Sequence, residues 1–555
     1  MRRESRSGLR SWQVSEQYVS RLFLGETFVK RILLSSVAFF AFAAAGHAED
    51  LSGLAQSNAP VRLANPADAM AADLPYKAPV KAPAPVNDDI CWHGICLYGN
   101  FDMGVTYNQH GNPLTTYETP NYLVERGSNG SYFGAAPNAM SSSFIGLRGK
   151  QEVADNLFAV FNLQTIFIPS SGMNMNGLGA LAQNNGLGAA PQYQNVNSYG
   201  DTSKAGQMFN NAAYFGISSP TYGTFTMGRQ SALSSDNVVN YDPLSGAGAF
   251  SAITFEGLSG GGGDTEDRIW DNSYEYRLNV GPVRLAAEAQ LGNGGNSSTG
   301  NAFQGDIGFD YMGLSMDFLG GKTQDALSLA DTLSSAQVGL ITAQGIGCSM
   351  GCVGGIVSDN TVFQLAAKYT IGPWKLFGGY ENVRFANPDN PLAPGAFALG
   401  GYNIGAPNNG FYQTDRIMNV FWVGARYAIT RDLDITGAYY GYRQNSFVAG
   451  GGTPAGSLVN PTPAGVLGAV SNPGGDCTTS ISPGCSGAMD MGSIVLDWRF
   501  ARHVDLYAGV SYIQKTGGLA SGYNLTYSNM NVAATANTFN KVSTYDPTIG
   551  LRYQF

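Results

Sequence analysis

The sequence predicts an all-β protein, a transmembrane antiparallel β-barrel of about sixteen strands. Three observations lead to this prediction. Many stretches of about ten residues alternate apolar and polar side chains, which puts one kind on each face of a strand. Short turns and long loops follow one another in turn along the chain. An export signal precedes the first stretch, and no later apolar run is long enough for a transmembrane helix, so only a closed barrel could cross lipid.

The composition suits strands that are joined by polar loops. Only 13% of the 555 residues are charged, while 73 are Gly, 29 are Tyr and 29 are Phe. The 31 basic and 40 acidic residues give a net charge of −9. This acidic balance argues against a nucleic-acid partner, since nucleic-acid binding favours basic patches.

Residues 1–48 are predicted to be a leader and signal peptide. Lys30-Arg31 precede an apolar run from Ile32 to Ala45, and small residues then favour cleavage after Ala48. The polar residues before the run have two interpretations: an unusually long basic region, or an untranslated stretch with the true start near Val29.

Residues 49–90 are predicted to be a Pro/Ala-rich periplasmic lead-in to a barrel that spans residues 91–555. One interpretation is a spacer that touches peptidoglycan through Lys77 and Lys81. The favoured one is a disordered segment, because its composition cannot bury a core. The lead-in is also too short for a plug domain, which disfavours a gated transporter.

The six cysteines form three close pairs in sequence: Cys91 with Cys96, Cys348 with Cys352, and Cys477 with Cys485. An exported chain enters an oxidising compartment, so three small disulfides are expected. A zinc site is the rival interpretation, but the chain has 4 His, and they are scattered. We therefore expect no metal and no cofactor.

The strands are predicted in order from the alternating stretches. The first covers residues 97–109, and 142–153 and 157–168 form a hairpin, as do 209–218 and 223–230. The long connections include residues 170–207, 323–360, 388–416 and 448–489. Short turns lie between the other stretches, at Gly281-Pro282, Met312-Gly313, Gly372-Pro373, Thr430–Asp432 and Arg502-His503. Short periplasmic turns and long extracellular loops are typical of an outer-membrane barrel. A β-propeller would show a repeat of fixed period, and the sequence has none.

The last stretch alternates Ile549, Leu551, Tyr553 and Phe555 with Gly550, Arg552 and Gln554. We expect it to be the sixteenth strand and to close the barrel against residues 97–107. Arg552 and Gln554 should face water in the lumen, and the apolar set should face lipid. Tyr553 and Phe555 are predicted to belong to the signal that the barrel assembly machinery reads. Aromatic residues near other strand ends would form the interfacial girdles, as at Trp374, Tyr427, Tyr440 and Trp498.

From about residue 97 to 555 the chain resembles the trimeric general diffusion porins of Gram-negative bacteria, in their alphaproteobacterial or rhizobial form. The sharpest strings are Leu97-Tyr-Gly-Asn-Phe-Asp and Ser142-Ser-Phe-Ile-Gly-Leu-Arg-Gly-Lys. The resemblance continues through Tyr222-Gly-Thr-Phe-Thr-Met-Gly-Arg-Gln and closes with the terminal Gly550-Leu-Arg-Tyr-Gln-Phe. The resemblance implies a homotrimer in the outer membrane, in contact with lipid and lipopolysaccharide. It also implies a water-filled pore for ions and small hydrophilic solutes, narrowed by a third long loop that folds inward.

That third loop should span residues 231–267. Acids on the loop that face bases on the wall would create a transverse field, which sorts solutes by charge. Candidate acids are Asp242 and Glu256, for which a constriction role and a plain solvated position are weighed equally. For Asp236, Asp264, Glu266 and Asp267 the solvated position is favoured. Candidate wall bases are Arg148, Arg229, Arg268 and Arg277, with Lys150 beside them.

The resemblance breaks at three places. Phe144 and Asn211 stand where many members of the family carry a lumen arginine, and Gln164 stands where some carry a carboxylate. The basic ladder is therefore thinner than in most members.

The leading functional prediction is passive diffusion through a channel, with no catalysis. A surface adhesin or receptor that acts through its loops is the alternative, and an outer-membrane enzyme is a weaker one. General acid–base chemistry usually relies on His, and the candidates in the barrel, His110 and His503, are far apart in sequence.

Overall fold

The computed structural model describes residues 90–109, 131–176, 206–253, 268–292, 300–332, 352–389, 397–399, 402–408, 412–447, 485–520 and 541–555. All of them belong to one compact unit, Ala55–Phe555. Residues 1–89, which include the predicted signal peptide and almost all of the predicted lead-in, lie outside the described residues.

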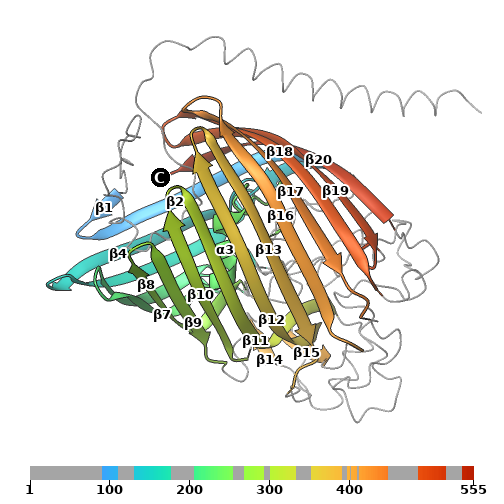
Figure 1. Cartoon of the computed structure of the whole chain (residues 1–555), viewed down its shortest axis with the longest axis horizontal. Coiled ribbons are helices and arrows are strands. Elements are labelled where there is room, and N and C mark those ends of the chain that lie inside the picture. The colour runs from blue at the N-terminus through green and yellow to red at the C-terminus, as the bar shows by residue number, and fades with distance from the viewer. Residues whose placement is uncertain are drawn as a thin grey trace, which may run out of the picture. The chain divides into compact units, whose positions relative to one another are not determined.

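The unit is a closed barrel of sixteen long antiparallel strands (Figure 1). They are β2 (Ile95–Asn108), β4 (Ser143–Ala154), β5 (Leu157–Phe167), β6 (Ala212–Ser219), β7 (Gly223–Ser231), β8 (Ile269–Val280), β9 (Val283–Gln290), β10 (Ala302–Tyr311), β11 (Leu314–Thr332), β12 (Cys352–Ile371), β13 (Trp374–Ala386), β16 (Arg416–Ala428), β17 (Leu433–Gln444), β18 (Gly487–Ala501), β19 (Val504–Gly517) and β20 (Lys541–Gln554). Four short strands accompany them: β1 (Ile90–Trp92), β3 (Tyr132–Pro137), β14 (Phe397–Leu399) and β15 (Tyr402–Asn408).

The barrel closes where β20 pairs with β2, and Gly550 lies opposite Gly104 in this seam. A side chain at Gly104 would meet the Ile549 carbonyl at 2.3 Å, so the close approach of the two strands requires glycine here. The prediction that the final stretch is the sixteenth strand and closes against the first is confirmed.

Short turns and long loops alternate as predicted. The β4–β5 turn has Asn156 at φ 55°, and Gly281 and Gly372 adopt the same left-handed region in two further turns. One loop is shorter than expected. Residues 323–360 were predicted as loop because they are rich in Gly and Ser, but β11 extends to Thr332 and β12 begins at Cys352. Pairing between these two strands overrides the weak local preference.

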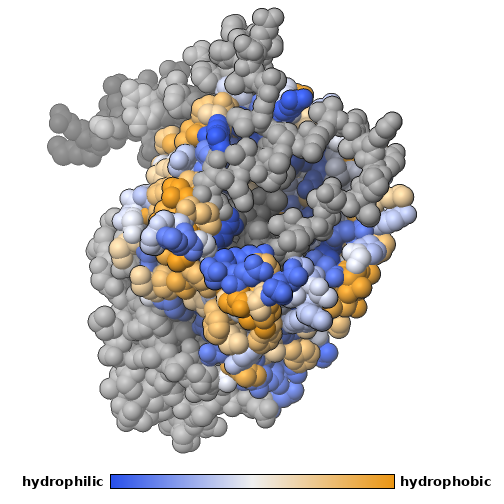
Figure 2. All heavy atoms as spheres, turned by 90° about the vertical axis from the view of Figure 1, so that its left-hand side faces the viewer, coloured by the Kyte–Doolittle hydropathy of each residue, from blue (hydrophilic) through white to orange (hydrophobic). Residues whose placement is uncertain are grey.

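The two faces of the sheet differ as the alternation predicts. On β20, Leu551 and Tyr553 are 44% and 43% exposed, whereas Arg552 between them is 6% exposed and points inward. Figure 2 shows apolar residues along the flanks of the barrel and hydrophilic residues closer to its hollowed centre. No helix in the described ranges is long and apolar enough to cross a membrane.

A small hairpin extends the barrel at the short-turn end of the seam. β1 pairs with the first residues of β2, and the Cys91–Cys96 disulfide joins the two strands, as predicted. Cys485 is also disulfide-bonded. Its predicted partner, Cys477, lies outside the described residues, as does Cys348, so these two pairings stay predictions.

Candidate pore constriction

The connection between β7 and β8, here called L3 (residues 232–268, of which 232–253 and 268 are described), folds into the barrel. Its two ends meet, because the Ala232 N–H donates to the Arg268 carbonyl at 2.9 Å. The loop then forms α3 (Leu233–Tyr241), which packs against the inner face of β9–β13. The inward third loop is therefore confirmed.

Wall residues fix the N-terminal end of α3. Its N-cap residue, Ala232, makes no side-chain capping hydrogen bond. Instead, Glu288 on β9 accepts the Leu233 N–H at 3.1 Å, and Gln304 on β10 accepts the Ser234 N–H at 2.8 Å. A helix leaves its first N–H groups unpaired and carries partial positive charge at that end. The buried carboxylate and amide thus hold the helix at one height on the wall.

The C-terminal end of α3 is held in the same way, with the charges reversed. The Trp422 indole N–H donates to the Tyr241 carbonyl at 3.0 Å. Lys368 donates to the Asn240 carbonyl at 3.3 Å and also to its side chain. Cations are favourable beside the last carbonyls of a helix. Side chains of β12 and β16 therefore supply the hydrogen-bond donors for the C-terminal end of α3.

Asp242, a predicted constriction acid, is the next contact along the loop. Its side chain is fully buried, and its carboxylate accepts the Tyr440 hydroxyl at 2.6 Å and the N–H groups of Gly246 and Leu244 at 2.6 and 3.1 Å. Burial raises the pKa of Asp242. The structure thus places Asp242 at an anchor between L3 and β17, and it does not bring Asp242 together with the predicted arginines.

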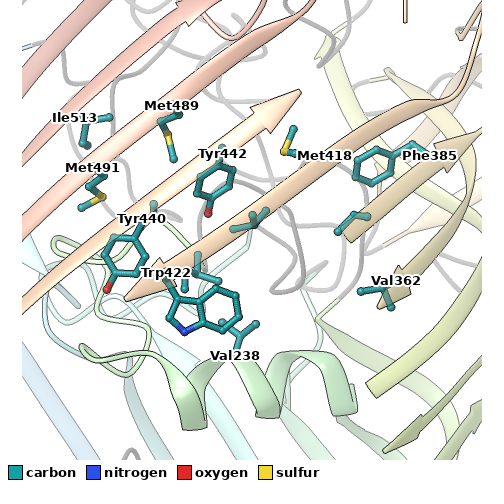
Figure 3. Close-up of a cluster of buried hydrophobic side chains, with 14 of the residues drawn as sticks. Val238, Val362, Phe385, Met418, Trp422, Tyr440, Tyr442, Met489, Met491 and Ile513 are labelled. Carbon is teal, nitrogen blue, oxygen red and sulfur yellow. The ribbon is translucent and has the colours of Figure 1, made fainter. Parts of the chain in front are cut away.

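A large apolar cluster seals L3 against the upper inner wall (Figure 3). Val238 of α3 faces Trp422, and aromatic and methionine side chains continue the cluster across four strands. These inward residues are almost fully buried: Phe385, Met418, Trp422, Tyr440, Tyr442, Met489, Met491 and Ile513. Further along, the hydroxyls of Ser493 and Ser511 donate to the Phe250 and Ala249 carbonyls at 2.7 and 3.1 Å. Packed side chains and loop backbone therefore fill the barrel along β12–β19.

On its other side, L3 carries one acid that meets a wall base. Asp236 of α3 forms an ion pair with Arg277 of β8 at 2.6 Å, and Arg277 also binds Glu275 at 2.5 Å. Tyr214 on β6 lies close to all three. Asp236 is 31% exposed and Arg277 is 20% exposed, so the pair remains accessible to water in the lumen.

The other predicted bases lie apart from this pair. Arg148 is half-buried, with its guanidinium 4.9 Å from the Tyr98 ring. Arg229 is buried and binds Asp271 and the Asn210 carbonyl, both at 2.6 Å. Arg229 follows Gly228, where the pairing of β7 with β8 has a bulge, and it is at an outward position of the strand like Met227. Arg268 is half-buried at the base of L3. Glu256, Asp264, Glu266 and Asp267 lie outside the described residues.

Sequence reasoning missed three wall residues that position L3, namely Glu288, Gln304 and Trp422. It assigned a fourth, Tyr440, to the interfacial girdle, which is wrong because Tyr440 is fully buried on the inner face. Each lies at an inward position of its strand, which the alternation in the sequence indicates. The sequence does not indicate where along each strand the loop makes contact. That position depends on contacts between residues as far apart as Asp242 and Tyr440, which are 198 positions apart.

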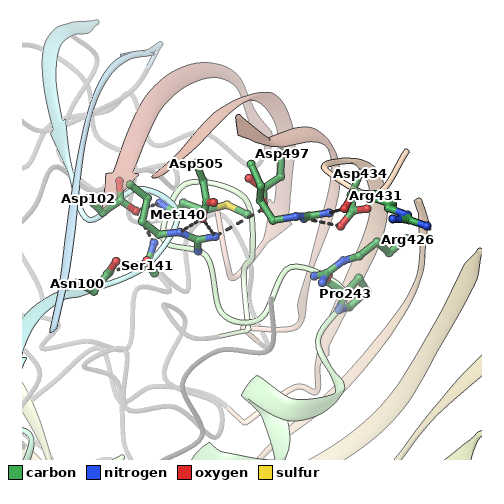
Figure 4. Close-up of polar contacts among 12 residues, drawn as sticks. Asn100, Asp102, Met140, Ser141, Pro243, Arg426, Arg431, Asp434, Asp497 and Asp505 are labelled. Carbon is green, nitrogen blue, oxygen red and sulfur yellow. Dashed lines mark hydrogen bonds and ion pairs between the residues drawn. The ribbon is translucent and has the colours of Figure 1, made fainter. Parts of the chain in front are cut away.

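A belt of charges crosses the inner wall near the short turns (Figure 4). Arg552 binds Asp505 at 2.6 Å and lies 3.6 Å from Asp497, and Arg499 binds Asp434 at 2.9 Å. The next strand along carries Arg426, which donates to the Pro243 carbonyl of L3 at 2.9 Å. Most acids of the belt thus have an arginine as a direct partner.

A family model described as Gram-negative porin matches residues 35–457. The chain belongs to the Gram-negative porins. Among solved structures, this porin is similar to the anion-selective porin from Comamonas acidovorans, with 15% identity over 83% of this chain and 99% of that one, at a TM-score of 0.49. It is similar to OmpT, an outer membrane protein of Vibrio cholerae, with 13% identity over 84% and 100% of the two chains, at a TM-score of 0.47. It is also similar to Salmonella typhi OmpF, with 13% identity over 83% and 97%, at a TM-score of 0.39. No curated protein matches it in sequence.

Family and fold together establish what this porin is. It is a multi-pass β-barrel of the outer membrane that forms a channel for passive diffusion of small hydrophilic solutes. The short turns therefore face the periplasm and the long loops face the exterior.

Proposed function

We propose that solutes pass between L3 and the wall formed by β4–β8, and that the Asp236–Arg277 ion pair sets the charge selectivity of this path. The single observation that carries the proposal is the contact of this pair at 2.6 Å, on the side of L3 away from the apolar cluster. The opposite side of the loop is packed against β12–β19 and leaves little room for water.

The charges at this point are unequal. Arg277 lies between Asp236 and Glu275 and neutralises one of them. The facing wall carries Phe144 and Tyr214 at inward positions in addition to Arg148. Because charged side chains around a pore set its selectivity, we expect a weak preference for cations that depends on Arg277. Glu256 and Arg268 stay candidates for the same constriction.

The proposal includes the absence of catalysis. His503 lies in the β18–β19 turn, where its ring is 6.3 Å from that of Tyr553. His93 is in the β1–β2 turn, against Trp92. These positions give each ring a local packing partner at the periplasmic rim, and His110 lies outside the described residues.

We also propose that the porin is a homotrimer whose contact surface includes β6 and β7. These strands have 8 and 9 residues. At about 3.3 Å per residue and a tilt of about 40°, 8 residues rise about 20 Å, which is less than the apolar band of about 25 Å. Phe215 and Ile217 on β6 are 61% and 51% exposed. A neighbouring copy would cover this low apolar wall better than lipid does.

Three further predictions remain proposals. Residues 1–48 and 49–90 are a signal peptide with its leader and a periplasmic lead-in. The barrel assembly machinery reads Tyr553 and Phe555, which stack on each other with ring centroids 5.9 Å apart. Outer-membrane lipid and lipopolysaccharide surround the trimer.

Conductance through planar lipid bilayers tests the proposal. Purified porin should open in groups of three equal steps, and its reversal potential in a KCl gradient should shift when Arg277 is neutralised. A bilayer that stays silent would contradict the channel and favour a surface receptor. Steps that come singly would contradict the trimer alone.

A further inference from the structure

Polar side chains gather on the outer face of the barrel, near the exterior ends of three neighbouring strands. Arg384 lies two residues before the end of β13, and Arg443 lies one residue before the end of β17. Between these strands, Asn419 of β16 is directly opposite Asn382 in one ladder and directly opposite Arg443 in the other. All four occupy outward positions, because the residues on either side of each are buried inside the barrel. We call these four residues the outer arginine patch.

Aromatic side chains on the same face show how high the patch lies. Tyr380 and Tyr439 are four residues nearer to the periplasm than Arg384 and Arg443 on the same strands, and they are 46% and 37% exposed. At about 3.3 Å per residue and a tilt of about 40°, four residues correspond to about 10 Å of height. Girdles of aromatic residues mark the edges of the apolar band in such barrels. The patch therefore lies at the level of the exterior headgroups.

Each arginine of the patch is held by one carboxylate and keeps N–H groups for other partners. Arg384 donates to Asp415 through Nε at 2.5 Å and also through a terminal nitrogen. Arg443 donates to Asp490 at 2.7 Å and to one backbone carbonyl each of β17 and β18, at 2.7 and 3.1 Å. A guanidinium has five N–H donors, and these contacts use two and three of them. Arg384 and Arg443 are 58% and 43% exposed, so the other donors are accessible from outside the barrel.

The patch faces away from the proposed contact between subunits. β16 and β17 are the twelfth and thirteenth of the sixteen long strands, whereas β6 and β7 are the fourth and fifth. Half of the barrel wall thus separates the two surfaces. A neighbouring copy that covers β6 and β7 leaves the patch in contact with the lipid of the exterior leaflet.

We propose that the outer arginine patch binds the acidic headgroup of lipopolysaccharide through its phosphate or carboxylate groups. Arginine presents a planar fork that matches both groups. With strands about 4.8 Å apart, the two arginines stand about 10 Å apart across β16, so a headgroup with two acidic groups can contact both. The inference rests on the proposal that lipopolysaccharide surrounds the trimer, and the two can fail separately.

The test titrates lipopolysaccharide onto the purified, delipidated trimer and counts the bound lipid by native mass spectrometry. Arg384→Gln and Arg443→Gln should each raise the half-saturating concentration about tenfold, the effect of losing one hydrogen bond to a charged group. Arg431→Gln is the matched control, because Arg431 is exposed in the β16–β17 turn, at the periplasmic end of the same strands. Its half-saturating concentration should equal that of the wild type.

Asp490→Asn should act in the opposite direction. The substitution removes a negative charge beside the bound headgroup and releases one donor of Arg443, so the half-saturating concentration should fall. Damage to the wall would raise it instead, which separates binding by Arg443 from a merely structural role. Heat-modifiable gel mobility shows that each variant is a folded barrel.

Several results would overturn the proposal while leaving the channel in place. They are wild-type binding in either arginine variant, equal weakening in Arg431→Gln, or weaker binding in Asp490→Asn. Equal affinity for phosphatidylglycerol or for inorganic phosphate would mean a general anion surface and would also reject it. A trimer that binds no lipopolysaccharide at all would contradict the surrounding lipid as well.

Discussion

Arg277 is the residue on which the selectivity of this porin depends most directly. It joins Asp236 of the loop to Glu275 of the wall, at 2.6 and 2.5 Å. Two acids and one base share a narrow space that water still reaches. A single substitution there should therefore change which ions pass without disturbing the barrel, because β8 keeps all its backbone pairing.

Arg277→Gln should raise the permeability of K⁺ and lower that of Cl⁻ by about threefold each, the effect of one unit charge about 7 Å from the ion path in water, so that their ratio rises about sevenfold. The reversal potential in a KCl gradient measures this ratio. Arg443→Gln removes a charge from the outer face and should leave the ratio unchanged. An unaltered ratio in Arg277→Gln would place the selective point elsewhere in the lumen.

Asp242 should affect the position of L3 and have little effect on selectivity. In Asp242→Ala, the Tyr440 hydroxyl and two backbone N–H groups lose their acceptor, at a cost of about 1–3 kcal/mol for each buried group. We expect noisier single-channel currents and a lower temperature of barrel unfolding, with the reversal potential unchanged. Tyr440→Phe removes one donor and should have a smaller effect. A shift of reversal potential in Asp242→Ala would show that the carboxylate faces the pore after all.

At this scale the sequence predicts orientation better than contact. The parity of Arg552 was enough to place it in the lumen, and the structure confirms it with 6% exposure. The same reasoning put Asp242 and Asp236 on an inward loop and ranked Asp242 higher as a constriction acid, whereas the structure pairs Asp236 with a wall arginine. Which loop residue meets which strand depends on packing across the barrel, and no local pattern records it.

Among the elements, α3 depends most on its surroundings. A helix of 9 residues is too short to be stable alone in water. Glu288 and Gln304 hold one end and Trp422 holds the other, while the apolar cluster covers one side. The wall thus determines both the existence and the position of the element that narrows the pore.

Trp422→Ala should therefore loosen L3. The substitution removes a fully packed indole and its hydrogen bond to Tyr241, and such losses cost about 3–5 kcal/mol. We expect a larger and noisier single-channel conductance. Trp498→Ala is the matched control, because Trp498 lies at an outward position of β18 and should leave the conductance unchanged. A quiet channel of wild-type conductance in Trp422→Ala would mean that the remaining contacts suffice.

For the whole molecule, alternation and turn chemistry predicted nearly every strand. The predicted stretches 97–109, 142–153 and 157–168 match β2, β4 and β5 within about two residues. The prediction of a loop at 323–360 was wrong, because the long β11–β12 pairing accommodates the Gly and Ser residues of this stretch. Strand existence is a local property, whereas strand length near a loop is decided by the neighbouring strand.

Assembly should depend on the last residue. Phe555 exchanges two backbone hydrogen bonds with Gly99, at 2.8 and 3.1 Å, and its ring fills the space beside that glycine. Deletion of Phe555 should lower the yield of inserted barrel, and the channels that do insert should keep the wild-type reversal potential. Heat-modifiable gel mobility of membrane fractions measures the yield. Gly99→Val should give the same defect, because a Cβ there would lie 2.5 Å from the Phe555 ring. Normal yield in both variants would contradict an assembly role.

The β1 hairpin gives the seam a direction. β20 ends at the level of Gly99, and β1 then takes up the pairing of Ile95–Leu97, with the Cys91–Cys96 disulfide across it. The periplasmic end of the seam is therefore covered by a crosslinked strand. β1 thus pairs with the edge of β2 where β20 has ended, and the disulfide holds it there. An unpaired strand edge is a template for another chain, so the crosslinked hairpin should protect this end of the seam from pairing with an unfolded strand in the periplasm.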